Sequence, residues 1–298
     1  MKMFDPHIHM TSRTTDDYER MAAAGIQAVC EPAFWMGQPR THVGTFEDYF
    51  LSLLGWEKFR AEQFGIHHVC TLAMNPKEAN QPDLAKGVLE LLPLYLQKDS
   101  VVAVGEIGLD DQTQAEQEVM AAQIELAIKF NLPILIHTPH RDKKAGTQRC
   151  LDIVKESGIA PEMVLVDHNT EETVQGVLDL GYWAGHSVYP HTKMEETRMA
   201  KIAKEFGSER IIVNSAADWG VSDPLMVPKT VEAMRVLDIS DAEIETIVWK
   251  NPLGFFAQSG RIDVDKFETR PKFDQAKLFE ENSVLRGQEP KSSASAAN

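Results

Sequence analysis

The sequence predicts a single-domain α/β protein of the (β/α)8, or TIM, barrel class. Eight short apolar segments, rich in β-branched residues, occur at residues 2–4, 26–30, 67–72, 101–107, 133–136, 164–166, 182–184 and 211–213. Stretches with the spacing of an amphipathic helix follow them, for example from Val119 to Ile128. The segments are continuously apolar, as the strands of a parallel sheet buried on both faces must be. Eight strand–helix units in about 250 residues match this barrel.

A doubly wound open sheet is the competing fold. Its Gly-x-Gly-x-x-Gly fingerprint is absent, because Gly105 and Gly108 alone do not supply it. We therefore expect one barrel domain over residues 1–260, after which the strand–helix pattern weakens. Residues 261–298 would form a C-terminal extension. Its last part, residues 287–298, is rich in Ser and Ala, and we expect it to be disordered.

Composition narrows the class of protein. The 298 residues carry a formal net charge of −15, which works against broad binding of polyanions such as nucleic acid. No segment approaches the roughly 20 apolar residues of a membrane span, and the N-terminus lacks the apolar core of a signal peptide. The three cysteines are far apart and form no Cys-x-x-Cys motif. These features predict a cytoplasmic protein with reduced thiols and no membrane association.

Metal-ligating residue types stand at the ends of five of the predicted strands, where a barrel has its catalytic face. They are His7, His9, Glu106, His137, His168 and Asp218. A single histidine at such a position is more often a packed core residue, but six residues from five strand ends favour a metal site. His7 and His9, two apart on a strand, point to the same side. Imidazole and carboxylate ligands suit zinc best, with manganese, iron or magnesium as alternatives.

The mixture of ligands favours hydrolysis. A carboxylate such as Glu106 is able to bridge two cations, and two neighbouring cations polarise a substrate oxygen and lower the pKa of a shared water. Asp218 would then contact one metal weakly and accept the proton of that water. The simpler interpretation of Asp218 is a turn residue ahead of the helix that begins near Ser222.

The order of these motifs resembles the TatD-related metal-dependent hydrolases of the amidohydrolase superfamily. The resemblance covers about residues 3–257 and includes Asn251-Pro252 followed by Phe255 and Phe256. Residues 166–172 and 214–220 are similar to the predicted-hydrolase branch of that family. The resemblance implies two metal sites. Their ligands would be His7, His9, Glu106 and Asp218 for one ion, and Glu106, His137 and His168 for the other.

Two departures from the nuclease-type members bear on the substrate. Those members carry His-Cys-Phe-Ser/Thr-Gly after strand six, where this chain has His168-Asn169-Thr170-Glu171. They also have Glu-Thr-Asp at strand eight, where this chain has Ala216-Ala217-Asp218. We therefore expect a small substrate with an ester, amide or phosphoester bond. A TatD-type deoxyribonuclease and a catalytically silent ligand-binding barrel are the alternatives; the sequence does not indicate the oligomeric state.

Four residues are candidates for the substrate pocket. Arg141 would hold a substrate anion, with His140 beside it, although the run of charge around them also fits a solvated surface. Arg40 ends the long loop 32–40 and would line the pocket mouth, and His186 would contact substrate from beyond strand seven. Asp167 should alternate away from His168, so we interpret it as structural.

Overall fold

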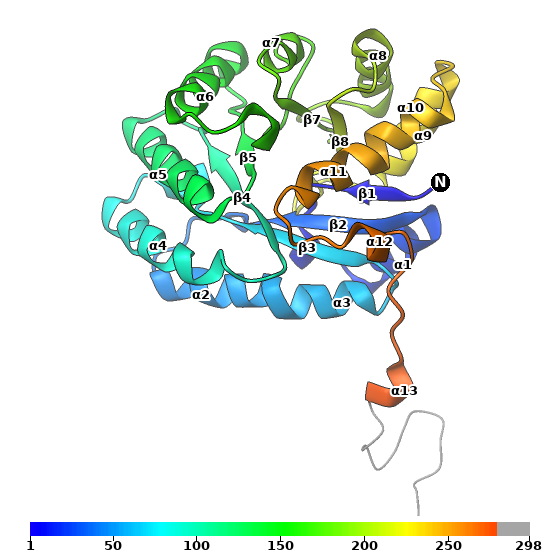
Figure 1. The fold of residues 1–298 in the computed structure, drawn as a ribbon, viewed down its shortest axis with the longest axis horizontal. Coiled ribbons are helices and arrows are strands. Elements are labelled where there is room, and N and C mark those ends of the chain that lie inside the picture. Colours follow the sequence, from blue (N-terminus) through cyan, green and yellow to red (C-terminus); the bar gives the residue numbers. More distant parts are fainter. Residues whose placement is uncertain (279–298) are drawn as a thin grey trace, which may run out of the picture.

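The structure, a computed structural model, describes residues 1–278 and forms the predicted (β/α)8 barrel (Figure 1). Its strands form one sheet in sequence order, and each neighbouring pair is parallel. The strands are β1 (Met3–Asp5), β2 (Ile26–Pro32), β3 (His67–Leu72), β4 (Val101–Gly108), β5 (Ile134–His137), β6 (Val164–Val166), β7 (Trp183–Ser187) and β8 (Ile211–Asn214). The fold class predicted from the sequence is confirmed.

The first and last strands meet just beyond their carboxyl ends. The backbone N–H of His9 donates to the carbonyl of Ala217 at 2.9 Å, and the N–H of Ala216 donates to the carbonyl of His7 at 2.8 Å. These bonds join the segment that carries His7 and His9 to the segment that leads to Asp218. Two segments that lie more than 200 residues apart in the sequence therefore meet at one face of the barrel.

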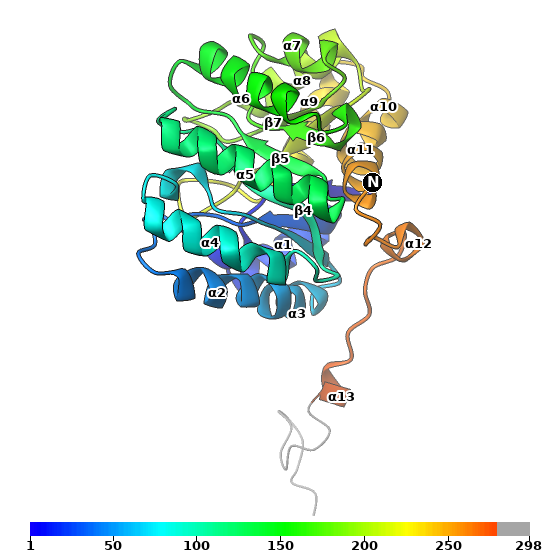
Figure 2. The ribbon, with the colours of Figure 1, turned by 60° about the vertical axis from the view of Figure 1, so that its left-hand side comes forward.

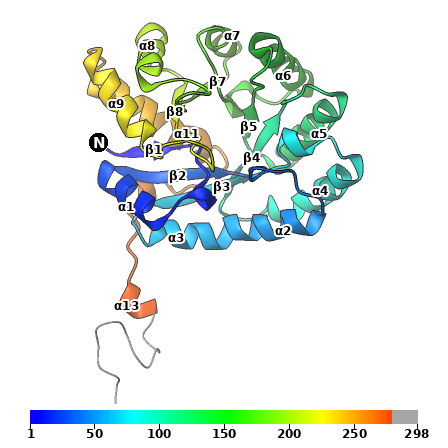
Figure 3. The same cartoon turned by 180° about the vertical axis from the view of Figure 1, so that it is seen from behind.

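Helices surround the strands as an outer ring, seen from opposite sides in Figures 1 and 3. They are α1 (Thr15–Ala24), α2 (Val43–Leu51), α3 (Lys58–Glu62), α4 (Pro82–Tyr95), α5 (Gln114–Phe130), α6 (Lys143–Ser157), α7 (Val174–Asp179), α8 (Glu196–Phe206) and α9 (Met226–Val236). After α10 (Asp241–Glu245), a π-helical turn continues into α11 (Asn251–Ala257). The buried faces of the ring pack on the outer sides of the strands in one large apolar core.

A second apolar cluster fills the barrel and closes its amino end. Phe4 on β1 packs against Phe256 of α11, with ring centroids 5.9 Å apart, and Phe256 packs against Phe255 at 5.0 Å. The Asn251 side chain donates to the carbonyl of Ile211 at 2.7 Å, which ties α11 to β8. The motif of Asn251 to Phe256 is therefore a structural plug, and the polar residues lie at the opposite end.

The described part of the C-terminal extension packs on the barrel and then leaves it. Phe267, in α12 (Val264–Phe267), is buried with its ring 6.3 Å from that of Phe4. The chain then runs to α13 (Gln275–Leu278), which stands clear of the barrel in all three ribbon views, including Figure 2. The predicted disorder of residues 287–298 concerns residues outside the described range. None of the helices in residues 1–278 has the length and apolarity needed to cross a bilayer.

Candidate metal centre

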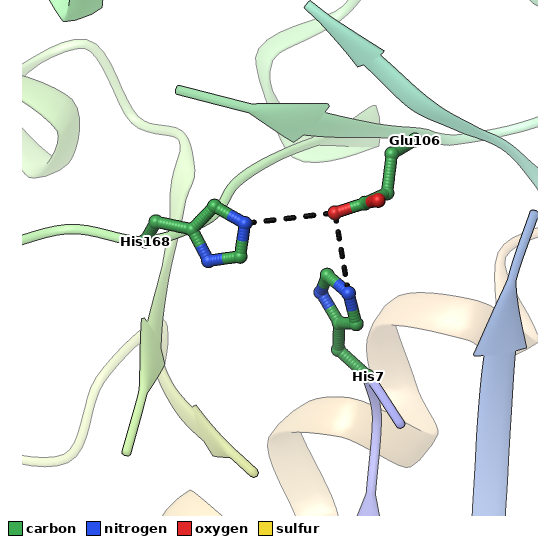
Figure 4. A group of neighbouring side chains, drawn as sticks. All are labelled: His7, Glu106 and His168. Carbon is green, nitrogen blue, oxygen red and sulfur yellow. Dashed lines mark ion pairs between the residues drawn. The ribbon is translucent and has the colours of Figure 1, made fainter. Parts of the chain in front are cut away.

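Five of the six predicted ligands form a buried cluster at the carboxyl end of the barrel. They are His7 and His9 after β1, Glu106 on β4, His137 on β5 and His168 after β6. Nitrogen atoms of three imidazoles face one oxygen, Oε1 of Glu106: His7 Nε2 at 3.2 Å, and His137 Nδ1 and His168 Nε2 at 3.5 Å each. Figure 4 shows His7 and His168 pointing at this oxygen from two directions.

The imidazoles also face one another. His7 Nε2 lies 3.2 Å from His9 Nε2, and His168 Nε2 lies 3.1 Å from His137 Nδ1. The cluster therefore consists of two histidine pairs that share the carboxylate of Glu106. One atom from each of His7, Glu106 and His168 lies within 4.8 Å of the others, which is close enough for a single ion to touch all three.

Hydrogen bonds on the outer side of the rings fix which nitrogen is protonated. His7 Nδ1 lies 2.5 Å from Oδ2 of Asp167, and a carboxylate only accepts, so this nitrogen carries the hydrogen. His168 Nδ1 lies 2.6 Å from the Ser187 hydroxyl, which itself donates to Asp167 Oδ1 at 3.4 Å. His168 Nδ1 therefore donates as well. In the neutral rings, both Nε2 atoms present lone pairs to Glu106.

A cation between these groups would remove an electrostatic conflict. Lone pairs of His7 and His168 otherwise face a carboxylate oxygen at 3.2 to 3.5 Å. In addition, His9 Nδ1 and His137 Nε2 are buried without a hydrogen-bond partner within the described part of the chain. Imidazole nitrogens with a carboxylate oxygen are a typical zinc ligand set. The residues present therefore fit a divalent metal ion.

The electrostatic environment agrees with this protonation pattern. Burial, together with the nearby His7, lowers the pKa of His9 to about 3. Burial and the charge of Lys193 hold the pKa of His168 well below its ordinary value. Burial also lowers the pKa of His7, but Glu106 and Asp167 outweigh it and raise that pKa overall. Of His7, His9 and His168, His7 is thus the ring that would bind a proton when no metal ion is bound.

Glu106 is held ionised. Burial raises the pKa of its carboxyl group, but the neighbouring rings of His7, His137 and His168 overcome that effect and keep the pKa well below its ordinary value. Its second oxygen, Oε2, accepts from the Asn75 side-chain amide at 3.0 Å. Asn75 therefore orients the carboxylate and leaves Oε1 facing the imidazoles.

Asp218, the sixth predicted ligand, lies on the wall of a cavity of about 440 Å³ above the cluster. It is half-buried, and its Oδ1 accepts from the Tyr189 hydroxyl and from the Gly220 N–H, each at 2.8 Å. A Cβ atom on residue 220 would lie 2.1 Å from the Tyr189 hydroxyl oxygen. Glycine at this position therefore makes room for the hydrogen bond from Tyr189 to Asp218. The Arg13 guanidinium also donates to the carbonyl of Asp218 and holds the loop.

The structure corrects our interpretation of Asp167. The strand alternation that placed it away from the site ends with β6 at Val166, and His168 adopts a left-handed conformation with φ of 60°. Both His168 and Asp167 therefore face the centre, and Asp167 orients two histidines. Gly185 on β7 makes this possible, because a Cβ there would lie 2.5 Å from Asp167 Oδ1.

Arg40 is bound within the protein. Its guanidinium forms two hydrogen bonds with Glu78, at 2.9 and 3.0 Å, and a third with the carbonyl of Phe34 at 2.7 Å. It also lies over the ring of Tyr49, 4.3 Å from the centroid. Arg40 thus shapes loop 32–40 instead of facing the cavity. The loop itself supplies cavity walls through Phe34, which stacks on His9 at 4.0 Å, and Trp35.

The other three candidates for substrate binding lie in different environments. The side chain of Arg141 is 87% exposed and is not among the residues that line the cavity. His140 lines the cavity, with its ring 6.1 Å from that of His168. His186 lies within β7 and is fully buried outside the cavity, with Nδ1 3.3 Å from the carbonyl of Ile212. Of these three, the structure brings only His140 to the site.

Tyr189, Lys193 and Asn75 also line the cavity, and sequence reasoning did not single them out. Tyr189 and Lys193 lie in the long connection between β7 and α8, a place in a barrel where residues that contact substrate are common. Their position after a predicted strand was the sequence feature that could have indicated a role in the site. Asn75 follows β3 in the same way, between Met74 and Pro76.

Comparisons with known proteins identify the family. Residues 4–257 match the model of the TatD-related DNase family. The chain belongs to this family. An uncharacterized metal-dependent hydrolase of Methanocaldococcus jannaschii is 30% identical over 257 residues, which cover 85% of this chain and 99% of that protein. The solved structure of a TatD-like protein from Archaeoglobus fulgidus superposes with a TM-score of 0.71 at 28% identity, covering 85% of this chain and 99% of that one.

Two further matches are more distant. A human protein described as a deoxyribonuclease is 27% identical over 171 residues, which cover 52% of this chain and 57% of the human protein. An engineered lactonase with organophosphate hydrolysis activity has a TM-score of 0.63 at 14% identity, covering 85% of this chain and 95% of its own, so it supports the fold alone. This TatD-family chain is thus a metal-dependent hydrolase with a TIM-barrel fold.

Asp167 provides a test of how the ligands are oriented. Asp167→Asn removes the charge that fixes the ring of His7, and loss of such a partner typically weakens metal binding about 10- to 100-fold. The measurement is competition for zinc with a chromogenic chelator. Ser187→Ala, which removes the partner of His168 Nδ1, should act in the same direction. Asp179→Asn, on the exposed side of α7, is the matched control. Unchanged affinity in both site variants would contradict the orienting role.

His186 predicts a pH dependence of stability. Burial lowers its pKa from 6.5 to about 4, so the unfolded chain binds this proton more readily than the folded protein. The free energy of unfolding should therefore fall as the pH drops from 6.5, by about 3 kcal/mol at pH 4 from this residue. Denaturant unfolding of wild type and His186→Gln between pH 7 and 4 measures it, with the exposed His42→Gln as control. Parallel curves for wild type and His186→Gln would refute this effect.

Proposed function

We propose that the enzyme uses two divalent metal ions to hydrolyse an ester, amide or phosphoester bond of a small anionic or polar substrate. His7, His9, Glu106 and Asp218 would hold one ion. Glu106, His137 and His168 would hold the other. The observation that carries the proposal is the position of Glu106, whose Oε1 faces both histidine pairs at once. Zinc is the preferred metal because imidazole supplies most of the ligands, with manganese, iron and magnesium as alternatives.

The chemistry of the site would be divided between metal and protein. When bound, the ions supply a Lewis acid for the scissile carbonyl or phosphoryl group and lower the pKa of water. Asp218 accepts the proton that the attacking water releases. The Tyr189 hydroxyl and the Gly220 N–H already donate hydrogen bonds to its Oδ1, which leaves Oδ2 to take that proton. Burial and the neighbouring Asp218 raise the pKa of Tyr189 to about 12, so its hydroxyl remains a hydrogen-bond donor.

The cavity supports a small substrate. Its volume of about 440 Å³ lies in the range of sites for small molecules, and Phe34, Trp35 and Tyr189 form part of its walls. Its two lining lysines are Lys77 and Lys193, and Lys77 is paired with Asp110 at 2.6 Å. Tight binding of a nucleic acid needs several cations along its backbone. The net charge of −15 opposes such binding further.

Deoxyribonuclease activity is the second candidate, because the family model and the human relative both carry that description. A catalytically silent barrel is disfavoured, since the chain belongs to a hydrolase family and offers a ligand set that fits a metal. We place the enzyme in the cytoplasm, where its three buried free cysteines would remain reduced.

Asp218→Asn tests the proposed mechanism. The variant should keep most of its metal but lose about 10²- to 10⁴-fold in kcat/KM, because no group then accepts the proton of water. Glu106→Gln should lose metal as well as activity. Hydrolysis of 4-nitrophenyl acetate and bis-4-nitrophenyl phosphate, with elemental analysis of each variant, measures both effects. Asp223→Asn, on the same loop, serves as control. Wild-type activity in Asp218→Asn would rule out the assigned role.

The same variants decide between the two candidate substrates. Labelled single-stranded DNA is incubated with the enzyme and added Mg²⁺ or Mn²⁺, in parallel with a panel of esters, lactones and phosphates. The proposal predicts turnover within the panel and little cleavage of DNA. Efficient DNA digestion that Asp218→Asn abolishes would support the deoxyribonuclease instead.

A further inference from the structure

Lys193 brings an ammonium group into the cavity from the loop between β7 and α8. The loop turns tightly here, because the N–H of Lys193 donates to the carbonyl of Tyr189 at 3.0 Å. The side chain folds back over Tyr189, with Nζ 5.4 Å from the ring centroid. The Tyr189 hydroxyl in turn donates to Asp218, the proposed proton acceptor. Lys193 lines the same cavity as the metal-ligating histidines.

This ammonium group has no ion-pair partner within residues 1–278, where no carboxylate oxygen lies within 4.0 Å of it. Lys77, the other lysine of the cavity, forms an ion pair with Asp110. Burial lowers the pKa of Lys193, and the attraction of Glu106, Asp167 and Asp218 only partly opposes this. Lys193 is half-buried, and partial removal of a cation from water without pairing it costs free energy. An anionic group that entered the cavity would recover part of that cost.

Lys193 has no role in the proposed mechanism of hydrolysis. It is not a metal ligand, and Asp218 already accepts the proton. We propose that Lys193 binds a second anionic group of the substrate, a carboxylate or a phosphate that is remote from the bond being cleaved. Preferred substrates would then be small molecules with a negative charge on the part that remains in the cavity. This inference rests on the proposed hydrolase function and names its substrate class.

The surroundings of Lys193 suit one such group. Thr192, next to it in sequence, lines the cavity too and adds a hydroxyl. The face of Tyr189 stabilises the ammonium through a cation–π contact and limits its movement. One ammonium neutralises one carboxylate or phosphate, whereas a polyanion would need a row of them. The arrangement therefore favours a compact anion over a strand of nucleic acid.

The test compares two esters that differ in one charge. Mono-4-nitrophenyl glutarate and 4-nitrophenyl valerate have acyl chains of the same length, but only the first ends in a carboxylate. Metal-loaded wild type should prefer the glutarate ester in kcat/KM. Lys193→Met should reduce that preference roughly 10- to 100-fold, mainly through KM, as expected for loss of a charged hydrogen bond. Lys193→Arg should restore part of it. Lys201→Met, an exposed lysine of α8, is the control and should keep the wild-type preference.

A binding experiment that does not depend on turnover accompanies it. Calorimetric titration of metal-loaded wild type and Lys193→Met with glutarate, neutral glutaramide and inorganic phosphate measures each affinity. Weaker binding of glutarate in the variant indicates a carboxylate, and weaker binding of phosphate alone indicates a phosphoryl group. Glutaramide should show no difference.

The outcomes separate this inference from the proposed function. If both esters are hydrolysed in an Asp218-dependent reaction with equal preference in wild type and Lys193→Met, the hydrolase stands and the role of Lys193 is refuted. An equal loss on both esters also refutes it, because Lys193 then acts on the centre as a whole. If neither ester reacts but anion affinity depends on Lys193, the anion site stands and this mechanism of ester hydrolysis fails. Anion affinities that do not differ between wild type and Lys193→Met overturn the inference.

Discussion

Oxygen Oε1 of Glu106 lies within 3.5 Å of nitrogen atoms from His7, His137 and His168, which come from three separate places in the chain. The hydrogens of His7 and His168 are directed outward, because Asp167 and Ser187 accept them. Several lone pairs are therefore concentrated in one buried volume, which is unfavourable unless a cation is present. The fit to a metal ion is a property of this arrangement and not of any one residue.

The barrel keeps this arrangement in place. Backbone bonds from His9 to Ala217 and from Ala216 to His7 join the first and last strands at the level of the candidate ligands. The apolar plug of α11 closes the amino end of the barrel and so supports the strands from the end opposite the candidate ligands. Loops that surround the cavity are fixed by contacts of their own. Examples are Arg40 with Glu78 in one loop, and Tyr189 with Asp218 between two others.

The fold and the clustering of the candidate ligands could be predicted because both depend on patterns that are local in sequence. Apolar strands recur at regular intervals, and His7, Glu106, His137 and His168 all stand where such a strand stops. Orientation was harder to predict where the strand geometry ends. Asp167 follows β6, beyond which alternation no longer applies, and His186 proved to lie inside β7, where its side chain points away from the cavity. The partners of Arg40 and the position of Lys193 depend on tertiary contacts, which the sequence does not reveal.

We propose that Glu106 joins two metal ions within one site. This is tested most directly by a crystal structure of protein loaded with Zn²⁺ or Mn²⁺, with anomalous diffraction data collected at the absorption edge of the metal. We expect two anomalous peaks, both within coordination distance of Glu106. One peak should also contact His7 and His9, and the other should contact His137 and His168. A single peak, or peaks that do not touch Glu106, would show that Glu106 does not join two metal ions.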